Sequence, residues 1–541
     1  MTEGGPVAGE QRGGVTGSPV SRAVKPGPGP SASAEFYAQV KAPIGVTSHS
    51  SEPLYRQLRR ALELQVLHGN LSPHLPIPSS RELARELGIS RNTVNAAFQE
   101  LLASGVIESR ARRGYFINAQ MIQGATVAAP AREAGPGPDP VDWSSHVIRR
   151  RDADMPEITK VRDWATQPYP FVAGQVDERD FPRLSWARAL REALDPPHLH
   201  YSLRDGVDED DPYLLEKLCK QVLPARGIAV EPENVLITAG SQQGLDLLAH
   251  TIMGPGTVVG VEDPGYADAR HTFVRAGATL HPMPVDDQGV VPPADFSAMD
   301  LLYLTPSHHS PTNVTLSGER RQQILAGTRA AKALVIEDDY DSEFRYRGKP
   351  TPALKAQPEN EHVIYLGSFT KFLAPGLRLG YLVADAALVT ELRNQRRYRL
   401  RHISGHPQRA MALLIESGQY HRTISRRRTQ LQRKWGVLCQ ALDDVLPWPV
   451  VAPPGGVSIW VPGPPDLDCV ALARQALEAG IVIERGDVFF SDPEANRNHF
   501  RLGFAAISLE SIRPGIEELG RVIERSRAAG NPGSQGPLAP V

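Results

Sequence analysis

Apolar and polar positions follow two different patterns along the 541-residue chain. From about residue 165 to 526, short apolar runs alternate with segments of helical periodicity; the clearest runs are NVLITAG, TVVGVED, ALVIEDD and HVIYLGS. Strand-length apolar runs that alternate with helices are typical of a largely parallel sheet. We therefore predict an α/β domain over residues 165–526.

A purely helical pattern precedes this domain. One face of a first helix is formed by Leu54, Leu58, Ala61 and Leu62. Two further short helical patterns follow between residues 79 and 103 and are separated by Gly88. Ser79 and Glu82 have the spacing of a capping box, and Ser90 can cap the next helix. The inward-facing positions of that next helix are Val94, Ala97 and Leu101. This arrangement predicts a helix-turn-helix.

The second helix of this motif begins with polar side chains, which lie in the major groove when such a motif binds DNA. The segment after it, GVIESRARRGYFIN, is typical of two short strands with a basic tip. We therefore predict a winged helix over residues 48–118. The residues expected to contact DNA are Ser80, Arg81, Ser90, Arg91, Asn92, Thr93, Asn95, Arg112 and Arg113. The alternative is a helix-turn-helix that binds no DNA.

The remaining segments are rich in glycine, proline, alanine and serine and cannot bury a core. We predict disordered tails at residues 1–38 and 527–541 and a linker at residues 119–164.

A net charge of −2 excludes a field that draws the whole molecule to nucleic acid or membrane, so DNA binding requires a local patch. The three cysteines are far apart and lack metal-ligand spacing, which argues against disulfides and a zinc site. The N-terminus does not resemble a signal peptide. No apolar run approaches the roughly 20 residues that span a bilayer. The simplest setting is a reducing cytoplasm, with no membrane partner.

The segment GSFTKFLAPGLRLG, residues 367–380, places a lysine close to an arginine after a predicted strand. Lys371 could form an imine with an aldehyde cofactor. Ser368 and Arg378 could both reach a phosphate group. Most Lys–Arg pairs lie on solvated surfaces, however, so this interpretation depends on whether the rest of a cofactor site is present.

Other segments contain the remaining groups that pyridoxal 5′-phosphate requires. They are phosphate contacts at Gly240, Ser241 and Gln242, a pyridine partner at Asp338, a phenolic-oxygen partner at Tyr340 and a stacking ring at Tyr266. Arg501, at the start of a predicted strand, could clamp the carboxylate of an amino acid. Each group taken singly has an ordinary alternative: a plain strand–helix turn, a solvated acidic loop or metal site, a surface tyrosine, or a structural ion pair.

The motifs resemble two known families. LYRQLRRALELQVLHGNL, PSSRELARELGISRNTV and GVIESRARRGYFI resemble the GntR-type winged helix, and residues 165–520 resemble fold type I aminotransferases, including the loop TPSHHSPTNVT. The whole chain resembles the MocR-type subfamily of GntR regulators. This resemblance implies Lys371 as the imine lysine, an amine or amino-acid effector (or pyridoxal phosphate itself), and head-to-tail homodimers on double-stranded DNA.

Two positions depart from the aminotransferase pattern. Ser310 stands where these enzymes usually have asparagine, and Asn313 replaces a glycine. The shorter side chain of Ser310 puts its contact with the phenolic oxygen of the cofactor in doubt.

The function expected is transcription regulation, with the aminotransferase-like domain used for sensing. The first alternative is pyridoxal-phosphate-dependent aminotransferase activity. The second is a plain repressor whose large domain is only a dimerisation scaffold.

Overall fold

The computed structural model describes residue 36 and residues 52–67, 70–111, 113–120, 141–148, 150, 152–357, 359–369, 371 and 373–530. The predicted tails and the middle of the predicted linker fall mostly outside these ranges. The chain divides into two compact units, Met1–His146 and Val147–Val541.

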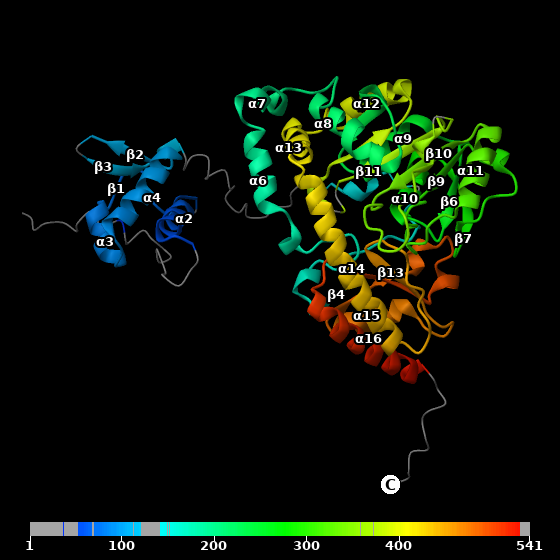
Figure 1. The fold of residues 1–541 in the computed structure, drawn as a ribbon. Helices are drawn as coiled ribbons and strands as arrows, with labels where there is room; N and C mark the ends of the chain where they lie inside the picture. Colours follow the sequence, from blue (N-terminus) through cyan, green and yellow to red (C-terminus); the bar gives the residue numbers. More distant parts are fainter. Residues whose placement is uncertain are drawn as a thin grey trace, which may run out of the picture. The chain divides into compact units, whose positions relative to one another are not determined.

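The N-terminal unit is a three-helix winged helix (Figure 1). Its elements are α2 (Leu54–Leu67), β1 (Pro76–Ile77), α3 (Ser80–Leu87), α4 (Arg91–Ala103), β2 (Ile107–Arg110) and β3 (Gly114–Ile117). The three strands pair in the order β1-β3-β2. The core of this unit includes Leu58 and Leu62 of α2 and Val94, Ala97 and Leu101 of α4.

Local sequence signals set the ends of these helices. The Ser79 side chain accepts from the backbone N–H of Glu82, and the Glu82 carboxylate accepts from that of Ser79, which confirms the capping box. Gly88 ends α3 with a φ of 64°, a conformation that glycine adopts readily. The Ser90 hydroxyl accepts from the N–H of Thr93 and begins α4.

The larger unit is built on one eight-stranded sheet (Figure 1). Its strands are β5 (Val235–Thr238), β12 (Gly380–Val383), β11 (Val363–Ser368), β10 (Leu334–Asp339), β9 (Leu301–Leu304), β6 (Val258–Asp263), β7 (Thr279–Asp286) and β8 (Gly289–Val290), in that spatial order. Only β12 and β8 run antiparallel to their neighbours. The prediction of a mostly parallel sheet is therefore confirmed.

Apolar side chains are buried on both faces of this sheet. In β5, Val235 and Ile237 belong to one core cluster, whereas Leu236 belongs to another. Strands that are covered on both faces need continuous apolar runs, which explains the pattern in the sequence.

The helices of this unit are α6 (Arg183–Glu192), α7 (Pro196–Leu203), α8 (Pro212–Lys217), α9 (Ser241–Ile252), α10 (Ala267–Ala276), α11 (Gly318–Ala331), α12 (Ala386–Leu400), α13 (Gly405–Glu416), α14 (Gln419–Val445), α15 (Cys469–Glu478) and α16 (Leu509–Gly530). A small antiparallel sheet, β13 (Ser458–Pro462), β16 (His499–Gly503) and β15 (Glu484–Arg485), lies in the C-terminal part, and β14 (Ile481–Val482) pairs with β4 (Tyr169–Pro170). Within the described ranges, no helix combines the length and apolar composition needed to cross a bilayer.

Candidate functional site

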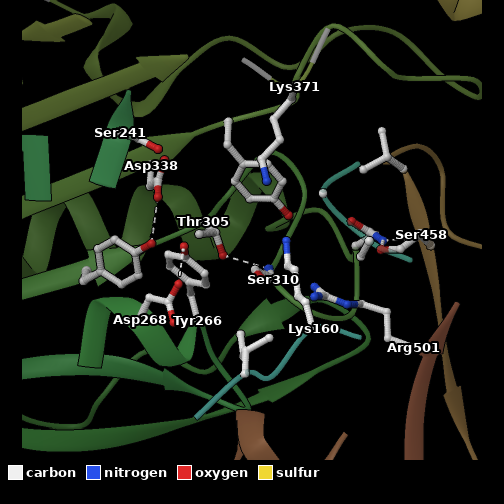
Figure 2. A pocket seen from close by; sticks show the side chains of 17 residues that line it. Lys160, Ser241, Tyr266, Asp268, Thr305, Ser310, Asp338, Lys371, Ser458 and Arg501 are labelled. Carbon is white, nitrogen blue, oxygen red and sulfur yellow. Dashed lines mark hydrogen bonds between the residues drawn. The ribbon is translucent and has the colours of Figure 1, made fainter. Parts of the chain in front are cut away.

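Lys371 follows β11 and its side chain lines a pocket at the carboxyl ends of the parallel strands (Figure 2). Burial lowers the pKa of this amine, and the nearby charges of Arg501 and Lys160 lower it further. A lysine with a lowered pKa is more often neutral, and the neutral amine is the form that attacks a carbonyl carbon. The environment of Lys371 therefore suits covalent chemistry at its nitrogen.

Asp338 ends β10 and faces the same pocket. Its Oδ2 accepts a hydrogen bond of 2.8 Å from the hydroxyl of Tyr303, while its buried Oδ1 has no hydrogen-bond partner among the described residues. Burial raises the pKa of this carboxyl to about 6. A buried carboxylate oxygen without a partner is costly, so this atom is ready to accept from a cationic N–H donor of a ligand.

Tyr266 caps α10 and lies across the pocket with its neighbour Asp268 (Figure 2). Its hydroxyl lies 3.1 Å from Asp268 Oδ2 and 3.3 Å from Gln242 Oε1. Gln242 in turn donates to Thr272 Oγ1 at 3.0 Å. These bonds hold the Tyr266 ring in place on the pocket wall, where it can stack on a flat ligand.

The first turn of α9 forms an anion-binding corner beside this wall. Gly240 is the N-cap, with a φ of 82°, and Ser241 is the first helical residue. A Cβ atom on Gly240 would lie 3.0 Å from Arg378 Nη2, so the missing side chain leaves room for the guanidinium. The helix N-terminus and a guanidinium together favour a phosphate group. Ser368, at the end of β11, is buried nearby in the sequence of the same loop.

Arg501, on β16, also lines the pocket, but it has a partner within the protein. It is directly opposite Glu484 in the β15–β16 pairing, and its Nε donates to Glu484 Oε2 at 2.8 Å. Its guanidinium also lies over the Phe489 ring, 4.6 Å from the ring centre. The ion pair that the sequence left open as an alternative is therefore present.

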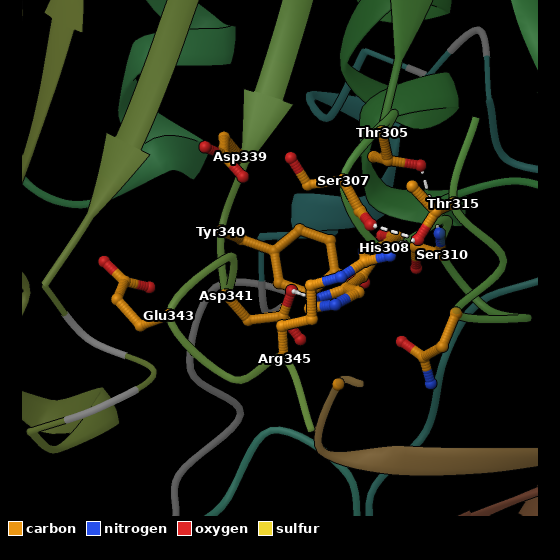
Figure 3. A network of polar contacts seen from close by, with 12 residues as sticks. Thr305, Ser307, His308, Ser310, Thr315, Asp339, Tyr340, Asp341, Glu343 and Arg345 are labelled. Carbon is orange, nitrogen blue, oxygen red and sulfur yellow. Dashed lines mark hydrogen bonds and ion pairs between the residues drawn. The ribbon is translucent and has the colours of Figure 1, made fainter. Parts of the chain in front are cut away.

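Two loops at the strand ends are joined by buried polar contacts (Figure 3). His308 Nδ1 lies 2.8 Å from Asp341 Oδ1, and the Tyr340 hydroxyl donates to the His308 carbonyl oxygen at 3.0 Å. Asp339 accepts from Arg226 Nε at 2.7 Å. The acidic segment after β10 is thus neither a solvated loop nor a cluster of metal ligands: within the described part of the chain, no group of three metal-ligating side chains occurs.

The two positions that depart from the aminotransferase pattern lie in one of these loops. Ser310 lines the pocket, and its N–H donates to Thr305 Oγ1 at 3.0 Å. Asn313 has a φ of 60°, and its side-chain amide donates to the Ser458 carbonyl oxygen at 2.7 Å. Asparagine tolerates this left-handed conformation better than most residues, so it can replace glycine here.

The pocket brings together Ser241, Tyr266, Asp338, Tyr340, Lys371 and Arg501 of the residues predicted from the sequence. Gly240, Gln242, Ser368 and Arg378 are not among its lining residues. The sequence analysis missed several lining residues, among them Lys160, Asp268 and Tyr303. Tyr303 is paired with Ile336 on the adjacent strand, so its position becomes evident only when the sheet is assembled.

In the N-terminal unit, the predicted DNA contacts share one region of the surface. Arg81, Ser90, Arg91, Asn92, Asn95 and Arg113 are exposed, and Ser80 and Thr93 are half-buried. Arg91 Nε donates to the Ser80 hydroxyl at 3.3 Å, which links the first turns of α3 and α4. Arg110, at the wing, pairs with Glu108 at 2.7 Å, and Arg112 lies outside the described residues.

Two protein families match this chain. Residues 54–117 match the bacterial regulatory proteins of the gntR family, and residues 176–519 match aminotransferase class I and II. The α-aminoadipate aminotransferase LysN from Thermus thermophilus, solved with N-(5′-phosphopyridoxyl)-L-leucine, has a TM-score of 0.64 at 27% identity and covers 72% of this chain and 100% of its own. The prediction of a fold type I aminotransferase-like domain is therefore confirmed.

Similar sequences carry both units on one chain. The HTH-type transcriptional regulator TauR of Rhodobacter capsulatus is 37% identical over 475 residues, which cover 87% of this chain and 96% of TauR. The probable rhizopine catabolism regulatory protein MocR of Rhizobium meliloti is 29% identical over 86% of this chain and 93% of its own. The chain therefore belongs to the MocR-type subfamily of GntR transcriptional regulators, in which a DNA-binding winged helix is joined to an aminotransferase-like domain.

Proposed function

We propose that this regulator binds pyridoxal phosphate and an amine or amino-acid effector in the pocket around Lys371, and that effector binding changes how the winged helix binds operator DNA. The observation that carries the proposal is the buried Asp338 Oδ1, which has no partner among the described residues and faces the pocket that also contains Lys371. A ligand with a cationic ring nitrogen and a group that reacts with amines would use both residues.

The residues present fit this cofactor. Asp338 Oδ1 would accept from the pyridine nitrogen, Tyr266 would stack on the ring, and Tyr340 would lie near the phenolic oxygen. The phosphate would be bound by the first turn of α9 and by neighbouring side chains: Gly240, Ser241, Gln242, Ser368 and Arg378. The missing side chain at Gly240, which lets the Arg378 guanidinium approach, supports this assignment.

When bound, pyridoxal phosphate supplies an aldehyde carbon that primary amines attack reversibly, so Lys371 and an effector amine would compete for it. The lowered pKa of Lys371 keeps its nitrogen available for this competition. Tyr303 holds the Asp338 carboxylate in place through a 2.8 Å hydrogen bond. Arg501 would lie beside the effector, on the side of the pocket opposite Asp338 (Figure 2).

Effector binding would act on DNA through a shift between two arrangements of the regulator. A ligand shifts such an equilibrium only by binding one arrangement more tightly than the other. Loss of the covalent link at Lys371 is the difference that we propose the effector creates. We also propose that the functional unit is a head-to-tail homodimer, as the family resemblance implies; light scattering of the purified protein tests this.

The experiment is a spectral titration of purified protein with a panel of amines and amino acids, followed by DNA footprinting with the amine that alters the cofactor absorbance. We expect the same amine to change both signals in the wild-type protein. In Lys371→Ala, the footprint should no longer respond. A Lys371→Ala protein whose footprint responded fully to the amine would contradict the mechanism.

Transamination is the second candidate, and the joint presence of Lys371, Asp338 and Tyr340 in one pocket favours it. It requires Lys371 to move a proton at the effector Cα atom after binding, which sensing does not. Many turnovers per site with an amino acid and a keto acid would support an enzyme; a response without turnover would support a sensor.

A further inference from the structure

Lys160 lines the pocket although it lies outside both family-matched regions, residues 54–117 and 176–519. It comes from the irregular segment that leads into the large unit. Its Nζ is 3.4 Å from the position that a Cβ atom on Gly174 would occupy, and Lys371 Nζ is 3.6 Å from the same point. A single glycine thus separates the two amines, and Figure 2 shows the Lys160 side chain reaching into the pocket.

The charges in the pocket are separated. Asp338 and Asp268 lie on the side of Ser241 and Tyr266, whereas Lys160 and Arg501 lie on the other side (Figure 2). Because Arg501 is paired with Glu484, these two side chains together carry no net charge. Lys160 makes no hydrogen bond or ion pair with any residue in the described ranges. It is therefore the cation at this side whose charge is not neutralised by a described neighbour.

The segment that carries Lys160 is anchored to α10. Asp152 is fully buried and accepts hydrogen bonds of 2.7 Å from both His271 Nδ1 and Arg275 Nε. His271 Nε2 lies 2.9 Å from the Pro156 carbonyl oxygen. Since α10 begins directly after Tyr266, the helix that borders the pocket also fixes the start of the stretch that brings Lys160 into it.

We propose that Lys160 binds the anionic group of the effector, and that the effector is a short primary amine that also carries a carboxylate or a sulfonate. The inference rests on the proposed function. With the effector amine near Lys371, an anionic group a few bonds away would lie within reach of the Lys160 ammonium. A charge-assisted hydrogen bond there gives an otherwise unpaired cation its partner.

The test compares wild-type protein with Lys160→Met, which removes the charge and keeps most of the length, and with Lys160→Arg, which keeps the charge. The full-length proteins loaded with pyridoxal phosphate are titrated spectroscopically with short ω-amino carboxylates and ω-amino sulfonates of two to four carbons. The same proteins are titrated with the plain amines of equal length. Lys220→Met, at an exposed position on α8's C-terminal side, is the matched control.

We expect Lys160→Met to weaken the binding of acidic amines by about 10- to 100-fold, the loss of one charged hydrogen bond, and to leave the binding of plain amines unchanged. Lys160→Arg should retain most of the preference for acidic amines, and Lys220→Met should match wild type. Comparison of the carboxylate and sulfonate series identifies which anion the pocket prefers.

An equal loss of affinity for acidic and plain amines in Lys160→Met, or no loss for either, would overturn the inference while leaving the proposed function in place. A wild-type protein whose absorbance responded to plain amines and not to acidic ones would do the same. A wild-type protein that bound pyridoxal phosphate and responded to no amine would instead remove the proposed function, and this inference with it.

Discussion

At the scale of single residues, Asp338 is the group whose chemistry depends most on its surroundings. Burial raises its pKa to about 6, and only the ionised form can accept from a protonated ring nitrogen. The sign follows directly: above this pKa the carboxylate is available, and as the pH falls through it the acceptor is lost.

We therefore expect the affinity for pyridoxal phosphate to fall when the pH is lowered from about 7.5 to about 5, as measured by equilibrium dialysis. Asp338→Asn should lower the affinity at the higher pH by about 10- to 100-fold and flatten the pH profile. Because the cofactor phosphate also titrates, the comparison between the two proteins is the decisive measurement. An Asn variant with the wild-type profile would show that Asp338 is not the group responsible.

Residues within continuous motifs could be predicted from the sequence, whereas those placed by packing could not. Lys371, Asp338 and Tyr266 each follow a recognisable apolar strand, so their positions at one edge of the sheet were predictable. Tyr303 lies inside the run LLYL and resembles an ordinary core residue. Glu484 meets Arg501 only through the pairing of β15 with β16, and Lys160 lies in a segment without regular structure.

At the scale of elements, α4 carries the polar surface expected to read DNA. Asn95 is exposed near its first turn, where side chains reach base edges in this class of motif. We expect Asn95→Ala to weaken operator binding by about 1–3 kcal/mol, measured by fluorescence anisotropy at fixed salt. Gln99→Ala, at an exposed position one turn later, is the control. Equal losses in the two variants would argue against base reading by Asn95.

A second element-scale feature is the ion pair that joins α12 to the loop before α8. Arg396 and Asp210 are both buried, and Arg396 Nη1 donates to Asp210 Oδ1 at 2.6 Å. Asp210→Ala would leave the guanidinium buried without its carboxylate, so we expect a loss of about 3–5 kcal/mol in the stability of the large unit. Thermal melting checks this, with the exposed Asp205→Ala as a control that should change little. The pair also accounts for part of the acidity of residues 201–215, which the sequence left unexplained.

At the scale of the whole molecule, Asp152 connects the segment that leads from the winged helix to the unit that contains the pocket. We expect Asp152→Asn to reduce the footprint change produced by saturating effector, because the segment would no longer be held firmly on α10. Saturation separates this effect from any change in effector affinity. Asp208→Asn, at an exposed position, should behave as wild type. An undiminished footprint change in Asp152→Asn would exclude this route of communication.

The double duty of α10 also bears on how such regulators diverge. Its first residues face the ligand, while His271 and Arg275, one and two turns later, hold the incoming chain. Selection for a new inducer would therefore be free to alter positions 266–268, provided that the histidine and the arginine persist. In lineages that lose Asp152, we expect both of these partners to drift together. Ligand choice and signal transfer would then be inherited as separable traits on a single helix.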